Sequence, residues 1–223
     1  MAKFKAHISL GVLLGLFSSI FVSFFSLTKN ILIALIVFFS VIIGSFLPDI
    51  DSDTGTPFQI IFGLLSFLAA IIMFYYLLQK GVSDHKMLIG LPIASLIFFR
   101  VVIGKIFQKI THHRGIWHSI PFVLIVTLFA LLITNKFDIS PYDKLIISIS
   151  IGVGYLSHLI LDEIYSLINI SGIPFTSKKS LGSALKFSSK SKTITFIAYL
   201  TVFALIYFTF PVLSEILRII QRN

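Results

Sequence analysis

The sequence contains no cysteine, so disulfide bonds and thiolate metal ligands are excluded from any account of its stability or chemistry. Charged residues are also scarce, at 12% of the 223 residues, while hydrophobic residues make up 57% and the mean hydropathy is +1.01. A water-soluble domain of this length cannot bury so much apolar surface. The composition therefore indicates an integral membrane protein.

Seven apolar runs approach or reach the roughly 20 helical residues that are needed to cross the hydrocarbon core of a bilayer. They cover residues 8–27, 31–47, 58–78, 87–107, 119–134, 145–168 and 194–213. The fifth run is short, and the fourth contains Lys105 and Arg100, whose long side chain we expect to reach toward the interface. We predict an all-α fold, a single integral membrane domain over residues 1–223. It is a polytopic transmembrane helix bundle of about seven spans with a polar site at its cytoplasmic end.

The polar segments between these runs fall into two sets, one on each side of the membrane. Alternation of the spans places residues 1–7, 48–57, 108–118 and 169–193 on one side, which carries the larger number of lysines and arginines. By the positive-inside rule we assign this side to the cytoplasm. The long polar segment 169–193 is either a solvated linker at the headgroups or a lid over a site. We attribute the net charge of +9 to contact with anionic lipid headgroups rather than with nucleic acid.

Four groups of polar residues lie on this same side, although they are scattered through the sequence. They are His7 in KFKAHISLG, the acidic run LPDIDSD (Asp49, Asp51 and Asp53), the segment HHRGIWHS (His112, His113, Arg114, His118 and Ser119) and SHLILDE (His158 and Asp162). Ionisable residues are costly near a bilayer, so their convergence at one end of the spans indicates a functional site. The remaining histidine, His85, falls on the opposite side and is interpreted as a solvated loop residue.

The SHLILDE segment places His158 and Asp162 one helical turn apart on one face, where both side chains can reach a single cation. The same spacing also fits a histidine that is hydrogen-bonded to a carboxylate at a helix end. Glu163 points about 100° away around the helix and is expected to be a supporting or surface residue. In LPDIDSD, Asp49 is nearest the span and is the first candidate ligand, followed by Asp51. An EF-hand loop is excluded because its glycine and glutamate are missing.

In HHRGIWHS, a turn at Gly115 would bring His113 and His118 together, while Arg114 offers a planar cation suited to a phosphate group. The alternative is a basic interfacial loop that Trp117 anchors at the headgroups. The HExxH pattern of zinc proteases, the GxSxG nucleophile elbow and glycine-rich phosphate loops are absent from the sequence. If the segment is catalytic, its chemistry is therefore of another kind.

Together these motifs give the chain a resemblance to the YdjM-like family of bacterial membrane-bound metal-dependent hydrolases, over almost its whole length. The residues that carry it are His7, LPDIDSD, HRGIWHS from His113 to Ser119, GYLSHLILDE from Gly154 to Glu163, and Pro174 with Phe175. The resemblance implies a hydrolase of the bacterial inner membrane that is distantly similar to zinc-dependent phospholipase C and P1-type nucleases. Those proteins carry a helical HxxxD pair of zinc ligands, which His158 and Asp162 match.

We therefore expect a membrane-bound hydrolase in which bound divalent metal activates water. The candidate metal ligands are His7, Asp49, His113, His118, His158 and Asp162, and the candidate catalytic residues are Arg114, as a clamp on a phosphoryl oxygen, and Asp51. Imidazole and carboxylate ligands without sulfur favour Zn²⁺, with Mn²⁺ as the alternative. The expected partner is membrane lipid, and the expected substrate is a phosphoester such as a lipid headgroup, ahead of nucleic acid.

Two other functions remain open at this point. A transporter or non-catalytic membrane regulator could use the same polar residues as an ion site, although transport sites usually lie near the bilayer midplane and these groups lie at span ends. A metal-free lipid phosphatase could use an HxxxD pair such as His158 and Asp162, but the PSGH signature of that class is absent.

Overall fold

The structure is a computed structural model that describes residues 3–51, 55–110, 116–167, 185–189 and 191–222. Its regular structure over these residues is helical, without a β-strand. The elements are α1 (Phe4–Phe24), α2 (Ile31–Phe46), the short 3₁₀ helix η1 (Leu47–Asp51), α3 (Thr56–Gln79), α4 (His85–Ile97), the π-helix η2 (Phe98–Ile103), α5 (Gly104–Ile110), α6 (Ile120–Thr134), α7 (Pro141–Leu167) and α8 (Lys192–Arg222).

Six helical stretches are long and apolar enough to cross a membrane, which confirms the prediction of an all-α membrane bundle. They are Phe4–Phe24, Ile31–Ile50, Thr56–Gln79, His85–Lys109, Pro141–Ser166 and Lys192–Ile219. The fifth predicted run forms α6, which has 15 residues. At 1.5 Å per residue this helix is about 22 Å long, shorter than a hydrocarbon core of about 30 Å.

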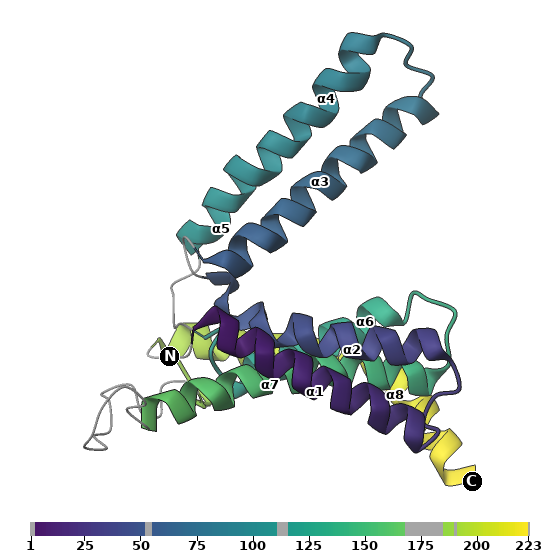
Figure 1. Cartoon of the computed structure of the whole chain (residues 1–223), viewed down its shortest axis with the longest axis vertical. Helices are drawn as coiled ribbons and strands as arrows, with labels where there is room; N and C mark the ends of the chain where they lie inside the picture. Colours follow the sequence, from purple (N-terminus) through teal and green to yellow (C-terminus); the bar gives the residue numbers. More distant parts are fainter. Residues whose placement is uncertain (1–2, 52–54, 111–115, 168–184, 190, 223) are drawn as a thin grey trace. The chain divides into compact units, whose positions relative to one another are not determined.

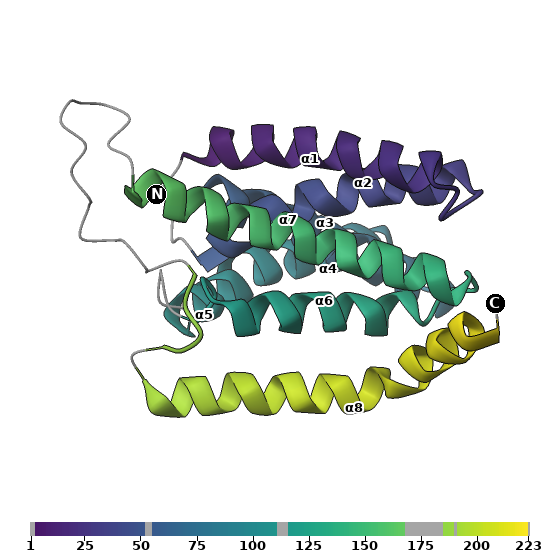
Figure 2. The same ribbon diagram turned by 90° about the horizontal axis from the view of Figure 1, so that it is seen from below.

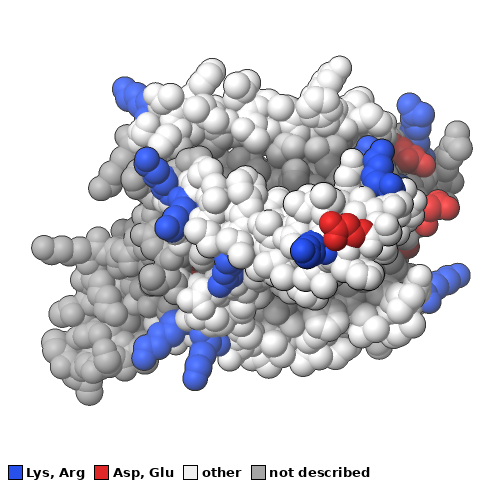
Figure 3. All heavy atoms as spheres, turned by 90° about the horizontal axis from the view of Figure 1, so that it is seen from above, with Lys and Arg blue, Asp and Glu red and all other residues white. Residues whose placement is uncertain are grey.

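The surface of the protein has the composition of a lipid-facing surface. In the space-filling view, broad uncharged areas separate the Lys, Arg, Asp and Glu side chains that are visible (Figure 3). Large apolar side chains such as Phe24, Phe203 and Tyr207 are more than half exposed. A soluble protein rarely exposes apolar patches of this extent, whereas hydrocarbon solvates them without cost.

The chain forms two compact units. The first comprises residues 1–48 and 114–223 and contains α1, α2, α6, α7 and α8; the second comprises residues 49–113 and contains α3, α4, η2 and α5. In the first unit α7 lies against α1, α2 and α6, and α8 packs chiefly on α6 (Figures 1 and 2). α7 is thus the central helix of this unit.

A close helix crossing in the first unit joins α2 to α7 through two glycines. A Cβ atom on Gly44 would collide with the carbonyl oxygen of Ile151, and one on Gly154 would collide with the carbonyl oxygen of Val41. Small residues are what allow two helix backbones to approach this closely in a membrane. Because Ser45 follows Gly44, the crossing also brings the main chain at the end of α2 against α7.

The second unit is a helical hairpin (Figure 1). α3 runs antiparallel to α4, which continues through η2 into α5. The side chain of Asp84 accepts a hydrogen bond of 2.9 Å from the main-chain N–H of Lys86 and so caps α4. Near the other end of the hairpin the ring of Phe62 lies 4.4 Å from that of Phe58 and 5.2 Å from that of Phe107, centroid to centroid. These rings pack α3 against α5.

Gly154→Ala tests the close crossing of α2 and α7. Alanine favours helix by roughly 1 kcal/mol over glycine, but the added Cβ must displace the main chain of Val41, and overpacking of this kind costs about 1–3 kcal/mol or more. We expect a lower midpoint of thermal unfolding in detergent. The matched control is Gly90→Ala in α4, where a Cβ would meet open space and the midpoint should stay level or rise. A midpoint for Gly154→Ala that matches the control would contradict the crossing.

Candidate metal centre

Four predicted site residues from three separate parts of the sequence meet inside the first unit. His7 lies in the first turn of α1, His118 lies two residues before α6, and His158 and Asp162 lie on successive turns of α7. Their side chains are almost completely buried, with exposed fractions between 0% and 3%. Burial of four ionisable side chains in one place is costly unless they neutralise one another or hold a charged ligand.

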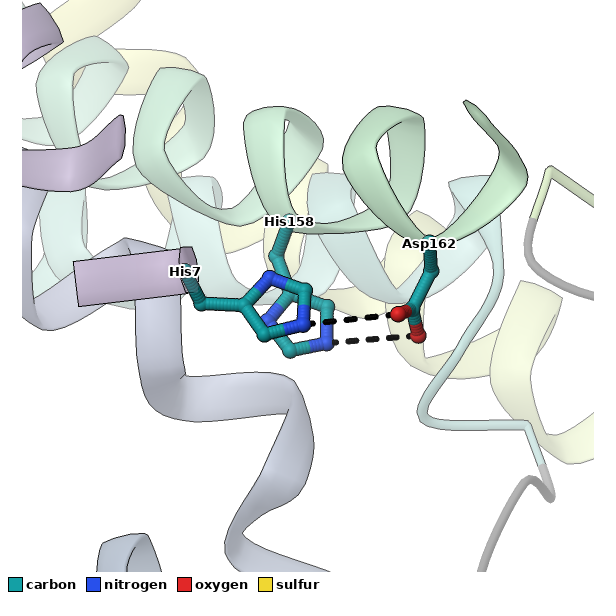
Figure 4. Close-up of side chains that lie close together, drawn as sticks. All are labelled: His7, His158 and Asp162. Carbon is teal, nitrogen blue, oxygen red and sulfur yellow. Dashed lines mark ion pairs between the residues drawn. The ribbon is translucent and has the colours of Figure 1, made fainter. Parts of the chain in front are cut away.

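Asp162 is the centre of this group. Its Oδ1 lies 3.3 Å from Nε2 of His7, and its Oδ2 lies 3.7 Å from Nε2 of His158 and 3.9 Å from Nε2 of His118. Figure 4 shows the Nε2 edges of His7 and His158 directed at the two carboxylate oxygens. Three imidazoles therefore present the same ring nitrogen to one carboxylate.

The rings of His7 and His158 are stacked, with centroids 3.6 Å apart and planes inclined by 12° (Figure 4). The ring of His118 approaches His158 edge-on, with centroids 5.5 Å apart. Two imidazolium cations would repel each other strongly at the stacking distance in a buried site. The arrangement therefore favours at least one neutral imidazole, which is the form that binds metal.

A main-chain carbonyl fixes the tautomer of His158. Nδ1 of His158 lies 2.8 Å from the carbonyl oxygen of Ser45 at the end of α2. Because a carbonyl can accept a hydrogen bond but cannot donate one, Nδ1 carries the proton, and Nε2 is left as the nitrogen that faces Asp162. A histidine that ligates metal through one nitrogen commonly donates its other N–H to a carbonyl in this way.

The geometry fits a divalent metal ion. The ligand atoms offered by His7, His158 and Asp162 all lie within 4.8 Å of one another. Bonds of about 2.0–2.1 Å to zinc place neighbouring tetrahedral ligands about 3.4 Å apart, close to the nitrogen-to-oxygen distances found here. Among the residues that the structure describes, neither ring nitrogen of His7 has a hydrogen-bond partner, although the side chain is 1% exposed. A bound cation would satisfy such a buried nitrogen.

His118 is held by contacts on both sides of it in the sequence. The hydroxyl of Tyr155, a fully buried residue of α7, donates a hydrogen bond of 2.6 Å to the carbonyl oxygen of Trp117. The main-chain N–H of Ile120 donates one of 2.9 Å to the carbonyl oxygen of Lys186. The short turn that carries His118 is thereby tied to α7 and to the segment that precedes α8.

The other predicted site residues lie in or next to the segments that connect the two units. Asp49 and Asp51 belong to η1, and Asp49 is half-buried. His113 and Arg114, together with His112 and Asp53, lie outside the described residues, as does most of the predicted loop 169–193. Their roles as ligands, catalytic residues or lid remain predictions. His85 is exposed at the start of α4, and Glu163 is half-buried beside Asp162.

Two residues that support the site were missed by the sequence analysis. Ser45 acts through its main-chain carbonyl, so its side-chain type carried no signal. Tyr155 did carry one, because positions 155, 158 and 162 follow the i, i+3, i+7 spacing of a single helix face. An aromatic hydroxyl on the same face as His158 and Asp162 indicates a polar contact near the site.

The fold and the buried cluster together define a polytopic helical membrane protein with a histidine and aspartate group that could hold a metal ion. The chain belongs to the YdjM inner membrane protein family, whose family model matches residues 1–217. This match confirms the resemblance carried by the sequence motifs and the assignment to the inner membrane. No curated protein and no solved structure matches the chain.

Tyr155→Phe tests the support of the His118 turn. Loss of the hydroxyl leaves the carbonyl of Trp117 without this donor, which costs about 1–3 kcal/mol for a buried group. We expect faster amide hydrogen exchange in residues 116–120, measured by mass spectrometry, with the helices still protected. Tyr207→Phe is the control, because Tyr207 is highly exposed. Unchanged exchange in residues 116–120 would mean that the hydroxyl does not hold this turn.

Proposed function

We propose that this protein is a metal-dependent hydrolase of the inner membrane that cleaves a phosphoester such as a lipid headgroup. The observation that carries the proposal is the convergence of three imidazole Nε2 atoms on the buried carboxylate of Asp162. Nitrogen and oxygen ligands in a chain without cysteine suit Zn²⁺, with Mn²⁺ as the alternative. When bound, such an ion lowers the pKa of a coordinated water and polarises a phosphoryl oxygen.

The side chains divide into those that hold the metal and those that meet the substrate. His7, His118, His158 and Asp162 form the buried part of the ligand set, and the carbonyl of Ser45 keeps His158 in the metal-binding tautomer. We assign Asp49 and His113 to the same ligand set. Arg114 orients a phosphoryl oxygen through its paired N–H groups, and Asp51 accepts or relays a proton.

The position of the cluster along its helices supports a substrate at the membrane surface. His7 is in the first turn of α1, His118 precedes α6, and Asp162 lies five residues before the end of α7. These are helix ends, whereas sites of transporters usually lie near the bilayer midplane. A lipid headgroup is the phosphoester found at that depth, which is why it ranks ahead of nucleic acid.

A second candidate is a non-catalytic transporter or regulator with a structural or transported ion. Its support is the nearly complete burial of His7, His118, His158 and Asp162, since structural metal sites are closed whereas catalytic sites keep an open position. Both candidates require bound metal. They differ in whether the protein hydrolyses a phosphoester with the help of Arg114, so one set of variants can separate them.

His158→Ala and Asp162→Ala test the ligand assignment. Each removes one ligand, and we expect zinc affinity to fall by about 100-fold or more, measured as metal per purified protein after dialysis against a weak chelator. Arg114→Ala should keep its metal but lose hydrolysis of a labelled phospholipid in mixed micelles. His85→Ala is the control, because this exposed histidine lies in the second unit.

The outcomes of this experiment separate the candidates. Full metal content in both His158→Ala and Asp162→Ala would show that the cluster is a hydrogen-bonded structural group and that the ligand assignment is wrong. The second candidate would be favoured by two results together. The variants would lose metal, and the wild-type protein would show no phosphoesterase activity toward lipid or nucleic acid.

We further propose that the site lies on the cytoplasmic side, which single-cysteine labelling can test. The natural chain has no cysteine, so each introduced thiol reports one position. Cysteines at positions 53, 112 and 178 should resist a membrane-impermeant thiol reagent in intact cells and react after permeabilisation, whereas one at position 85 should react at once. Split behaviour within the first group would contradict a shared compartment for the candidate site segments.

A further inference from the structure

A permanently charged residue lies inside one of the membrane-spanning stretches of the second unit. Arg100 belongs to the apolar helical stretch His85–Lys109 and is half-buried. Arginine stays protonated in proteins, and its charge is expensive in hydrocarbon unless another group compensates it. The groups around the guanidinium therefore indicate which kind of partner compensates its charge.

The protein itself offers this guanidinium a main-chain partner. Nη1 of Arg100 donates a hydrogen bond of 2.7 Å to the carbonyl oxygen of Gln59 on α3. A guanidinium has five N–H donors, so most of its capacity lies beyond this bond. Within the described part of the chain no carboxylate forms an ion pair with it. The sequence from 55 to 110 holds one acidic residue, Asp84, at the far end of the hairpin.

The guanidinium of Arg100 is held near the first turn of α3. Gln59 is the fourth residue of α3, so its carbonyl lies roughly 5 Å along the helix axis from the start of that helix. Two further cations, Lys105 and Lys109, follow toward the same end of the hairpin, and both are exposed. The helices α3, α4, η2 and α5 therefore carry positive charge at this end, whereas the acidic residues of this end of the second unit precede α3, in the segment 49–53.

Two features of the local backbone lie beside the guanidinium. Arg100 lies within the π-helix η2, a rare conformation that occurs frequently at functional sites. On the facing helix, Gly63 leaves space beside the side chain, because a Cβ there would lie 3.4 Å from Nη1 of Arg100. The apolar neighbours Ile60, Leu64 and Val101 are exposed. A planar cation is thus presented among side chains that suit acyl chains.

We propose that Arg100 anchors a binding site for the phosphate group of an anionic glycerophospholipid on the surface of the α3 and η2 helices. The guanidinium binds phosphate oxygens through paired N–H groups, and the exposed apolar side chains around it contact the acyl chains. This site lies within the second unit and does not depend on the proposed hydrolase. Its lipid is a bound ligand and not a reactant.

Native mass spectrometry of the full-length protein in detergent, titrated with phosphatidylglycerol, tests the site. Arg100→Gln removes the cation, and we expect the affinity for this lipid to fall about tenfold or more, the loss of a charge-assisted pair. Arg100→Lys keeps the charge but loses the paired N–H donors of the guanidinium. Its affinity for phosphatidylglycerol should lie between those of the wild type and Arg100→Gln. Lys86→Gln, at the other end of the hairpin, is the matched control and should bind as wild type does.

A second variant leaves the arginine in place. Gly63→Leu fills the space beside the guanidinium and should also weaken phosphatidylglycerol binding, which keeps the test valid if Arg100→Gln does not fold. Diacylglycerol, which lacks the phosphate, should bind wild type and Arg100→Gln alike. If both Arg100→Gln and Gly63→Leu bound phosphatidylglycerol as tightly as the wild type does, the proposal would be overturned. Arg100 would then serve only to hydrogen-bond the carbonyl of Gln59. Displacement of the lipid by inorganic phosphate alone would overturn the lipid as the ligand.

Discussion

The buried carboxylate of Asp162 is the group on which the arrangement of the first unit depends. Moving a carboxylate out of water costs several kcal/mol even after the surroundings relax, and Asp162 is 3% exposed on a helix whose neighbours are largely apolar. Polar or positively charged groups next to the carboxylate must therefore compensate this cost. The compensation comes from α1 through His7, from the same helix through His158, and from the turn before α6 through His118. One charge thus specifies where three parts of the chain have to meet.

The helices can meet there because small residues let them approach. Apolar side chains gain nothing from leaving lipid for one another, so association in a membrane relies on close packing and interhelical hydrogen bonds. Gly44 and Gly154 provide the close packing between α2 and α7. The hydrogen bond from His158 to Ser45 follows one residue after this crossing. The packing of α2 against α7 is therefore coupled to the orientation of His158. A change in this crossing would also move the imidazole of His158.

Sequence reasoning could predict the spans and the pairing of His158 with Asp162, because both depend on local periodicity. It placed His7 and His118 at the same end of the bundle by alternation of the spans, but their distances to Asp162 depend on helix packing that periodicity does not encode. Arg100 illustrates the same limit. Its reach toward the interface was expected, whereas the carbonyl of Gln59 as its acceptor depends on the register between two helices.

The stacking of His7 on His158 limits how many protons the buried cluster can hold. If Asp162 were balanced by protonation alone, the imidazolium would reside on His118 or on one ring of the stacked pair, whose centroids lie 3.6 Å apart. A second proton would then meet strong repulsion at that distance in a low-dielectric interior. A divalent ion avoids this conflict, because it binds neutral imidazoles and places its charge between them and the carboxylate. The buried cluster could therefore hold a cation that several ligands share.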